Sequence, residues 1–375
     1  MKKTRWFIAI LFAIATFSVY AAAGPGIDYG PWLTGVTQHS VTVKWGSSPS
    51  VGKVEYGPTA ALGREAEAVY AGGVHQAELT SLAAGARCYY RVTGGGETGK
   101  LQSFLTAPEP TAPFHFGVLS DTQGAPSAYA AVIEPLKATD PAFVLHNGDL
   151  VDYPFVDLEW RHFWGVTDRL AGQAPYFPVR GNHDGMLGGK QHFALYWSNP
   201  RNNSVISRSV YSFQYGNTYF IALDINEPYA AGSPQHQWLA RQLAYAKIRP
   251  DVKHCIVYAH FPPYSCSAHG ADANVLEFRA AVVPLFEKYD IDLSLAGHDH
   301  GYQRSVVNGI TYVVAGCASS RTYSCNPQSW TLKCEKTTNF ANIAIDGEAM
   351  RVEARRPDRS LIDSFTITHD FHGRS

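Results

Sequence analysis

The chain is poor in several features that would mark particular classes of protein. Only 17% of its 375 residues are charged, and no basic stripe of the kind that binds nucleic acid is present. It has no Cys-x-x-Cys pair, which excludes a thiol-redox motif and a zinc ribbon. It also has no internal repeat and no low-complexity tract. Hydrophobic residues make up 45% of the chain, which is typical of a packed globular protein and argues against disorder.

Long apolar runs are missing after residue 23, so the sequence predicts no membrane span in the rest of the chain. In residues 1–23, three basic residues precede an apolar run from Phe7 to Tyr20, and the small residues Ala21 to Ala23 follow. This order is typical of a cleaved secretory signal, with an uncleaved membrane anchor as the alternative. The signal predicts an exported protein, periplasmic or secreted. Removing its three positive charges changes the formal net charge from −1 to −4.

The six cysteines all follow the predicted signal, and an exported protein can form disulfides. Cys317, Cys325 and Cys334 fall in one loop-rich segment, which makes a disulfide there possible in principle, but the sequence does not fix the pairing. Cys255 lies in a predicted buried strand, where cysteine acts as a small apolar residue.

Residues 27–106 are predicted to form a β-sandwich. Short runs that alternate apolar and polar residues are separated by Gly, Pro and Ser turns, a spacing typical of an antiparallel sandwich of immunoglobulin size. The runs are Val41–Trp45, Lys53–Tyr56, Gln76–Leu79 and Tyr89–Val92. The corner at Leu82–Gly85 resembles the one before a late strand of fibronectin type III modules, with Cys88 in place of the usual Tyr.

Residues 107–113 contain three prolines and predict a stiff linker. Beyond it, residues 114–370 alternate apolar strand-like runs with helical segments, which indicates an α/β domain whose sheets are covered by helices. The predicted strands are Phe114–Leu119, Phe143–His146, Tyr176–Val179, Ile256–Ala259 and Leu293–Ala296, with a hairpin at Tyr211–Tyr215 and Thr218–Leu223. The predicted helices cover about 127–138, 155–170, 234–246 and 274–289.

Five short motifs place polar side chains at the ends of predicted strands. They are Ser120–Gln123, Gly148–Asp152, Gly181–Asp184, Val257–His260 and Gly297–His300. Strand ends of α/β sheets converge on one crevice, so these oxygen and imidazole groups should lie together. Each motif alone has an ordinary explanation, because an Asp after a strand is commonly a helix cap or turn former. In this order they predict two adjacent metal ions, a kind of site that most often hydrolyses phosphate esters.

The same motifs resemble those of the calcineurin-like metallophosphoesterases. The patterns are Asp-x-Gln, Gly-Asp-x-x-Asp, Gly-Asn-His-Asp, Val-x-x-His and Gly-His-x-His. Together with the fibronectin-like front, the stretch Gly297–Ser305 and the run His260–Ser265 followed by His269 look like purple acid phosphatases. The resemblance covers about residues 27–345. It implies a fibronectin III-like β-sandwich followed by a four-layer α/β/β/α catalytic domain.

The resemblance also implies two metal ions that share one carboxylate. The first set of ligands would be Asp121, Asp149, His300 and the amide oxygen of Gln123. The second would be Asp149, Asn182, His260 and His298. Carboxylate, amide and imidazole ligands without thiolate favour iron, manganese or zinc over calcium.

Two departures from purple acid phosphatases bear on iron. The tyrosine that ligates ferric iron in that family is replaced by Asp152, with Tyr153 one residue later, and Gln123 stands where many relatives have His. We therefore expect a colourless or weakly coloured protein. By similarity to Ser/Thr protein phosphatases, Asp152 would instead hold His183 and keep it protonated, with a helix cap as its structural alternative.

The expected reaction follows from the metals, which lower the pKa of a bound water from about 15.7 toward 7. The resulting hydroxide attacks phosphorus, and His183 donates a proton to the departing alkoxide. His269 and Arg304 are candidates for substrate binding, although an Arg such as Arg304 commonly pairs with a surface acid.

We therefore expect an exported phosphomonoesterase that acts on a small phosphate ester. A phosphodiesterase acting on nucleotides or lipid headgroups and a non-catalytic, metal-containing binding protein are the alternatives. Aromatic residues near the motifs either belong to the core, which we expect, or line a pocket that stacks a ring. They are Tyr153, Phe155, Trp160, Phe261 and Tyr264.

Overall fold

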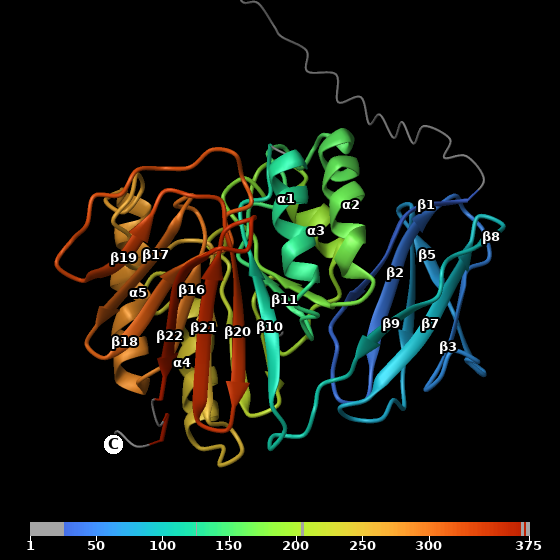
Figure 1. Cartoon of the computed structure of the whole chain (residues 1–375), viewed down its shortest axis with the longest axis horizontal. Coiled ribbons are helices and arrows are strands. Elements are labelled where there is room, and N and C mark those ends of the chain that lie inside the picture. The colour runs from blue at the N-terminus through green and yellow to red at the C-terminus, as the bar shows by residue number, and fades with distance from the viewer. Residues whose placement is uncertain (1–25, 125, 204–205, 369–370, 373–375) are drawn as a thin grey trace, which may run out of the picture.

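The computed structural model describes residues 26–124, 126–203, 206–368 and 371–372 (Figure 1). The predicted signal at residues 1–23 lies outside these ranges. Within them, no helix combines the length and the apolar character needed to cross a bilayer. The described chain forms a smaller block of strands followed by a larger block of strands and helices (Figure 1).

The first block is a β-sandwich, as the sequence predicts. One layer contains β1 (Ile27–Thr34), β2 (Val41–Ser47), β6 (Val74–Leu79) and β5 (Val69–Ala71). The other contains β3 (Lys53–Gly57), β4 (Arg64–Glu67), β7 (Arg87–Gly94), β8 (Glu97–Thr98) and β9 (Gln102–Leu105). In β7 every second residue is buried, and Tyr90 and Val92 share a core cluster with Trp45 of the facing layer. The fibronectin type III assignment stays a prediction.

The second block has two sheets with helices on their outer faces (Figure 1). The first contains β10 (Phe114–Leu119), β11 (Val144–His146), β12 (Tyr176–Pro178), β20 (Phe340–Asp346), β21 (Ala349–Arg355) and β22 (Leu361–Ile367). The second contains β13 (Tyr211–Tyr215), β14 (Thr218–Ala222), β15 (His254–Tyr258), β16 (Leu293–Ala296), β17 (Tyr302–Val307), β18 (Ile310–Val314) and β19 (Thr331–Glu335). The helices are α1 (Pro126–Lys137), α2 (Asp157–Ala171) and α3 (Gly189–Tyr196) on the first sheet, and α4 (Pro234–Lys247) and α5 (Ala273–Tyr289) on the second.

Side-chain alternation along the central strands produces these four layers. In β10, Phe116 and Val118 pack between the two sheets, whereas Leu119 packs with α1 and α2. In β15, Ile256 packs between the sheets and Val257 packs with α4 and α5. A strand covered on both faces is apolar throughout, and this is why such runs are recognisable in the sequence. The predicted strands, helices and hairpin are confirmed, with ends shifted by at most two residues, and α3 and the strands β17 to β22 are additions.

The two blocks share one sheet. Thr34 of β1 pairs with Tyr176 of β12 in parallel, so ten strands run without a break from β22 to β5. Trp32 of β1 packs on Trp164 of α2, with 4.1 Å between the ring centroids. Ala107, the first residue of the predicted linker, is buried in the sandwich core. The sandwich and the second block are therefore joined by backbone pairing and aromatic packing as well as by the chain between them.

Asp168 of α2 lies at this junction and gives the stability of the protein a dependence on pH. Its carboxylate accepts a hydrogen bond from the Gly30 N–H (2.7 Å). Burial raises the pKa of Asp168 from 3.8 to about 7, and the Gly30 hydrogen bond offsets this only in part. Between pH 3.8 and about 7, Asp168 keeps its proton in the folded chain, whereas the same carboxyl has lost its proton in the unfolded chain. Its contribution to stability is therefore present at low pH and is lost as the pH rises through about 7.

We expect Asp168→Asn to remove this dependence, because the amide oxygen can still accept the Gly30 hydrogen bond and does not titrate. At pH 8 the variant should be more stable than the parent by about 1 kcal/mol. This is well below about 1.4 kcal/mol per unit of pKa shift, because Asp168 is only partly buried and water screens its charge. Near pH 4 the two should be nearly equal. Urea unfolding at both pH values measures the difference, and a gap that does not change with pH would contradict the prediction.

Candidate metal centre

The predicted site residues follow parallel strands of both sheets. Asp121 and Asp149 come after β10 and β11, which run parallel, and His260 and His298 come after the parallel strands β15 and β16. Asp121, Asp149 and His298 adopt left-handed backbone conformations, with φ of 53°, 55° and 70°. Non-glycine residues enter this region rarely, at a cost of about 1–3 kcal/mol each. The surrounding structure therefore holds three of the turns at this site in strained conformations.

Asp149 lies at the centre of the first group of side chains. Its Oδ2 atom is 3.2 Å from His260 Nε2, and its Oδ1 atom accepts a hydrogen bond from the His183 N–H (2.9 Å). The amide oxygen of Asn182 lies 3.1 Å from the same His260 nitrogen. The His298 ring is beside the His260 ring, with 5.0 Å between centroids. A carboxylate, an amide and two imidazoles thus lie together.

Asp121 forms the second group with His300. Its Oδ1 atom is 3.4 Å from His300 Nε2 and accepts a hydrogen bond from the His298 N–H (3.1 Å). Gln123 lies between the groups, with its Nε2 atom 3.2 Å from Asp149 Oδ2 and 3.5 Å from His300 Nε2. Its amide nitrogen, and not the oxygen expected from the sequence, therefore faces Asp149. Asn182 and His260 therefore gather around Asp149 and His300 lies beside Asp121, whereas His298 contacts both groups and Gln123 lies between them.

Backbone carbonyls orient two of the imidazoles. His260 Nδ1 is 2.7 Å from the carbonyl oxygen of Asn147, and His300 Nδ1 is 2.6 Å from that of Arg321. A neutral imidazole that donates from Nδ1 keeps its lone pair at Nε2, the nitrogen that faces the carboxylates in both residues. This arrangement is typical of histidines that bind metals.

The buried polar atoms of the cluster fit a cation. Within the described residues, His298 Nε2 and Gln123 Oε1 are buried and have no hydrogen-bond partner, which is rare unless a ligand supplies one. Ligand atoms of Asp121, Asp149 and His260 lie within 4.8 Å of one another. Burial acts to lower the pKa of His260, but the Asp149 and Asp121 carboxylates outweigh it and raise the pKa to about 9. The two carboxylates therefore stabilise positive charge at the His260 position of the cluster.

Glycines allow the loops to approach each other. A Cβ atom on Gly181 would lie 2.0 Å from Asp149 Oδ1 and 2.5 Å from the Asp149 nitrogen. A Cβ atom on Gly297 would lie 1.8 Å from Ser120 Oγ and 2.8 Å from Asp121 Oδ2. Any larger residue at either position would displace a carboxylate of the cluster or the loop that carries it.

We expect Gly181→Ala to displace the Asp149 carboxylate, to weaken metal binding at this cluster, and to lower any catalytic rate that depends on the cluster by at least about 100-fold. Gly165→Ala is the matched control, because a Cβ atom there meets open space on α2. As a glycine replaced inside a helix, it should stabilise the protein by about 0.5–1 kcal/mol without changing activity. Metal content, initial rates and thermal unfolding of both variants test the prediction. Equal activity of the two would mean that the Gly181 contact is not needed.

His183 lies at the partly exposed side of the cluster, with its Nε2 atom 4.0 Å from Asp149 Oδ2. Its Nδ1 atom is 3.1 Å from the backbone carbonyl oxygen of Asp152 and 3.6 Å from the carboxylate of the same residue. Asp152 therefore contacts His183 as the resemblance implies, but the shorter contact is made by its backbone. His183 Nε2 is left facing the cluster.

The structure separates the two residues that were expected to bind substrate. His269 lies beside His298, with 4.7 Å between ring centroids, and its Nδ1 atom is 2.9 Å from Asp272 Oδ2. Arg304 instead forms an ion pair with Asp363 of β22, with 2.7 Å between Nε and Oδ2. No contact within the described residues joins Arg304 to the cluster, because β17 directs its side chain toward β22. Of the two residues, only His269 lies beside the cluster.

Asp184 is a residue of the site that the sequence interpretation passed over. Its carboxylate accepts hydrogen bonds from the N–H groups of Leu150 (3.1 Å) and Gly181 (2.8 Å). It thereby ties the loop that carries Asn182 and His183 to the loop that carries Asp149. The sequence did point to Asp184, because it is the last residue of the Gly-Asn-His-Asp motif.

A second group of residues also holds the loop that carries Asn182 and His183. No sequence motif indicates this group. The buried Arg180 pairs with Asp224, with 2.6 Å between Nη2 and Oδ2. The Asn226 amide donates to the Gly181 carbonyl oxygen (2.9 Å). Asp224 and Asn226 follow β14, so another strand end of the second sheet positions the His183 loop. An ion pair this deeply buried is costly to break, because one charge would be left without a partner.

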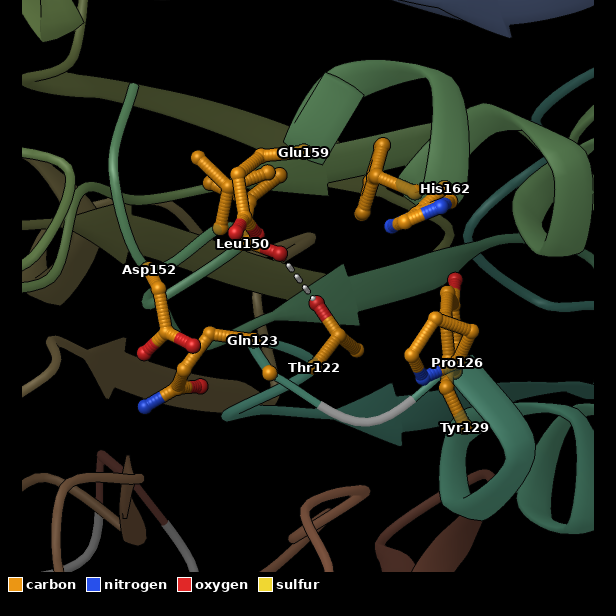
Figure 2. Close-up of a pocket in the computed structure, with 11 residues that line it drawn as sticks. Thr122, Gln123, Pro126, Tyr129, Leu150, Asp152, Glu159 and His162 are labelled. Carbon is orange, nitrogen blue, oxygen red and sulfur yellow. Dashed lines mark hydrogen bonds between the residues drawn. The ribbon is translucent and has the colours of Figure 1, made fainter. Parts of the chain in front are cut away.

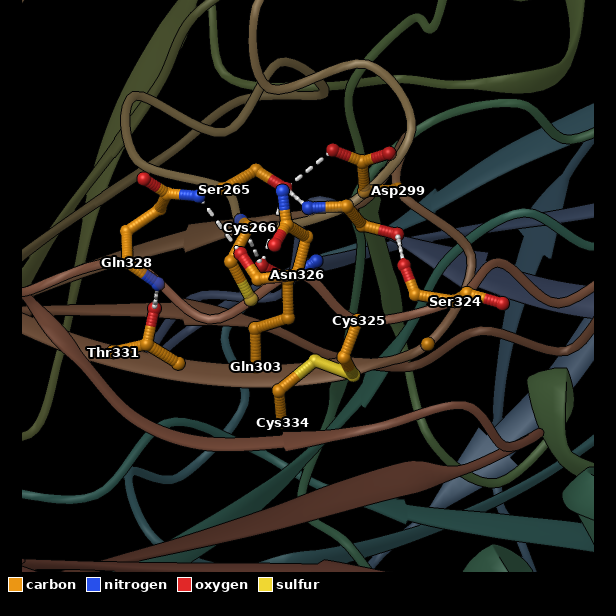
Figure 3. The surroundings of a disulfide bond; sticks show 12 residues. Ser265, Cys266, Asp299, Gln303, Ser324, Cys325, Asn326, Gln328, Thr331 and Cys334 are labelled. Carbon is orange, nitrogen blue, oxygen red and sulfur yellow. Dashed lines mark hydrogen bonds between the residues drawn. A yellow bond between two sulfur atoms is a disulfide. The ribbon is translucent and has the colours of Figure 1, made fainter.

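A disulfide closes the loop of residues 325–334, which lies near Cys266 and Asp299 (Figure 3). It joins Cys325 and Cys334, two of the three cysteines of the loop-rich segment, and the other four cysteines are buried thiols. The N–H of Asn326 in this loop donates to the carbonyl oxygen of Cys266 (2.7 Å). The disulfide loop, which begins four residues after Arg321, is thereby fastened to the segment between His260 and His269.

A cavity of about 290 Å³ adjoins the cluster on the side of Gln123 and Asp152 (Figure 2). Tyr129, Glu159 and His162 line its other walls. It has room for a small organic group beside the carboxylates. The aromatic residues near the motifs behave in two ways, because Trp160 and Phe261 belong to the core as expected, whereas Tyr153 and Phe155 are about half exposed. The core interpretation is wrong for these last two.

Comparisons with known proteins identify relatives of the second block. A sequence profile of the calcineurin-like phosphoesterases matches residues 114–302, just over half of the chain. The purple acid phosphatase of Glycine max is 28% identical over 258 residues, which cover 64% of this chain and 55% of that protein. The Fe(3+)-Zn(2+) purple acid phosphatase 12 of Arabidopsis thaliana is 27% identical over 261 residues, 64% of this chain and 54% of that protein. The chain thus spans little more than half the length of these relatives.

Among solved structures, the chain is similar to the purple acid phosphatase PPD1 isolated from yellow lupin (Lupinus luteus) seeds. The TM-score is 0.79 at 21% sequence identity, over 91% of this chain and 74% of the lupin chain. The likeness extends beyond the matched profile and includes most of the described strands and helices. At this identity it concerns the fold alone.

Proposed function

The chain belongs to the calcineurin-like phosphoesterase family, and from this premise we propose that it hydrolyses phosphate monoesters at the cluster around Asp149 and Asp121. One observation carries the proposal. Carboxylate, amide and imidazole groups from five separate strand ends converge on a buried cluster that contains unpartnered ligand atoms. Packing alone gives no reason for so many polar groups to be buried together.

We propose that the cluster holds two metal ions that share Asp149. The remaining ligands would be Asp121 and His300 on one side and Asn182, His260 and His298 on the other. When bound, the ions supply Lewis-acid charge for the phosphoryl oxygens and a water acidic enough to react near pH 7. Gln123 would hold the shared carboxylate through its amide nitrogen. The donor set suits iron, manganese or zinc, and the Fe(3+)-Zn(2+) relative supports this choice.

The chain's own residues would then handle the substrate. His183, oriented by the Asp152 carbonyl, presents Nε2 toward the cluster and would protonate the leaving alkoxide. His269, beside His298 and held by Asp272, would contact the phosphoryl oxygens. We leave Arg304 out of the substrate site because its guanidinium is paired with Asp363.

Initial rates on 4-nitrophenyl phosphate and bis(4-nitrophenyl) phosphate, measured on protein of known metal content, test this function. We expect the monoester to react faster. A faster diester reaction would replace the monoester assignment with the phosphodiesterase alternative. Failure to cleave either ester, with two metals bound, would leave the non-catalytic binding protein.

We further propose that the protein is exported and that its β-sandwich is of the fibronectin type III kind. The basic, apolar and small-residue order of residues 1–23 supports export, and so does the Cys325–Cys334 disulfide, because stable disulfides form mainly outside the cytosol. Sequencing the N-terminus of protein recovered from outside the cytosol should place it after residue 23. Recovery in the cytosol with residues 1–23 attached would contradict export.

A further inference from the structure

An exposed apolar patch lies next to the proposed catalytic site. Its five side chains range from 38% exposed at Met186 to 83% exposed at Leu187. They belong to two segments, one directly after Asp152 and one that starts three residues after His183. We call this set the rim patch. It consists of Tyr153, Phe155, Leu158, Met186 and Leu187.

The two segments of the rim patch touch each other. The Tyr153 and Phe155 rings are 5.8 Å apart between centroids. A Cβ atom on Gly188 would lie 3.8 Å from Phe155 Cα, and one on Gly189 would lie 3.2 Å from Pro154 Cγ. The chain that directly follows Leu187 therefore lies against the segment that carries Tyr153 and Phe155, so the exposed apolar side chains of the two segments lie near one another.

Hydrogen bonds hold the backbone beneath the rim patch in place. The buried indole of Trp160 donates a hydrogen bond to the Pro154 carbonyl oxygen (2.9 Å). The Met186 N–H donates to the His183 carbonyl oxygen (3.1 Å). The backbone of both segments is thus held in place near His183, and a molecule that binds the patch lies next to the site.

The exposure of the rim patch indicates what it binds. A contiguous set of exposed apolar side chains marks an interaction surface, because burying them is favourable. The Leu187 side chain is 83% exposed, so it projects from the surface and does not line a pocket. Close to it in the sequence, Asp157 and Glu159 outnumber Arg161, and Lys190 is paired with Glu227 (3.0 Å), so no excess of positive charge attracts the patch to a strongly anionic surface.

The position of the rim patch distinguishes between occupants. A protein or a second copy of the chain seated there would cover the approach to His183. A lipid surface would instead bring phosphate esters to it. We propose that the rim patch inserts into an uncharged or zwitterionic phospholipid surface, and that the substrates are phosphate monoesters of apolar alcohols held in that surface.

The substrate part of this proposal rests on the proposed function. Water would add to phosphorus, the bond between phosphorus and the alcohol oxygen would break, and His183 would supply the proton that the alcohol takes. The apolar alcohol stays in the lipid and inorganic phosphate leaves.

Flotation of the full chain with phosphatidylcholine vesicles tests the surface without relying on activity. We expect the parent to float with the vesicles and Phe155→Ser/Leu187→Ser to lose binding by at least about tenfold. Val51→Ser/Ile248→Ser is the matched control, since these side chains are 84% and 78% exposed outside the patch, and it should float like the parent. Thermal unfolding of each variant confirms that it is folded.

Several results would overturn the proposal. One is that the parent protein fails to float with the vesicles, and another is that the rim-patch variant floats as well as the control variant. A dimer or protein complex that depends on the rim patch, without vesicle binding, would also overturn it. Phosphate release from phosphatidate in the vesicles tests the substrate, and release that does not differ between the parent and the rim-patch variant would overturn that part. Hydrolysis of water-soluble 4-nitrophenyl phosphate by the parent is measured separately. It distinguishes failure of this inference from failure of the proposed function.

Discussion

Asp149→Asn should lose both bound metals and lower kcat/KM for phosphate monoesters by at least about 1000-fold. The carboxylate faces His260 and Gln123 through Oδ2 and accepts the His183 N–H through Oδ1, so every group around it depends on its charge and position. A neutral amide would weaken both proposed metal sites at once. Metal ions contribute several kcal/mol to the stabilisation of such a transition state, and each 1.4 kcal/mol is about a factor of ten in rate.

Asp140→Asn is a close control for this variant. Asp140 shares the left-handed backbone of Asp149, with φ of 53°, but its side chain is 76% exposed at the surface. The control should keep parental metal content and activity, which would show that an Asn in this conformation is tolerated. The measurements are elemental analysis of the purified proteins and initial rates on 4-nitrophenyl phosphate. If Asp149→Asn keeps two metals and the parental rate, Asp149 is not the shared ligand.

His183→Ala should lower kcat by about 100-fold to 10,000-fold while both metals stay bound. His183 contacts the cluster through its backbone N–H and the orientation of its ring, and it is not among the groups that close on His260 or His300. The loss should be larger for an alkyl phosphate than for 4-nitrophenyl phosphate, because an alkoxide needs the proton more than a nitrophenolate does. This dependence on the leaving group separates a proton donor from a residue that only supports the fold.

Asp152→Asn is the natural comparison for His183→Ala. The Asp152 carbonyl remains in this variant and is the nearer partner of His183 Nδ1, so we expect a loss within about tenfold. A loss as large as that of His183→Ala would assign the orienting role to the carboxylate. Loss of metal from His183→Ala, measured by elemental analysis, would instead make His183 a ligand.

Much of the fold could be predicted because its central strands carry a local signal. Phe114–Leu119 and Ile256–Ala259 are apolar on both faces, since each is covered by the other sheet and by helices. The same strands end in Asp121 and His260, so strand prediction and ligand prediction supported each other. The α3 helix was missed because it begins at Gly189 in a glycine-rich segment and has a weak apolar stripe.

The remaining differences come from contacts between distant residues. Nothing local at Arg304 indicates that Asp363 will lie opposite, 59 residues later in the chain. The sequence likewise cannot tell which end of the Gln123 amide faces Asp149. The pairing of Thr34 with Tyr176 leaves no pattern in either segment, so a boundary at the prolines of residues 107–113 was the natural interpretation.

That pairing makes the N-terminal sandwich part of the same sheet as the strands that carry the proposed catalytic site. A chain shortened to begin at residue 107 would leave β12 as a bare edge strand, with unpaired backbone groups able to recruit a strand from another molecule. It would also uncover Trp164, which now packs on Trp32. Truncation should therefore yield aggregates instead of a smaller working enzyme. The two blocks should also tumble in solution as one body, with no hinge between them.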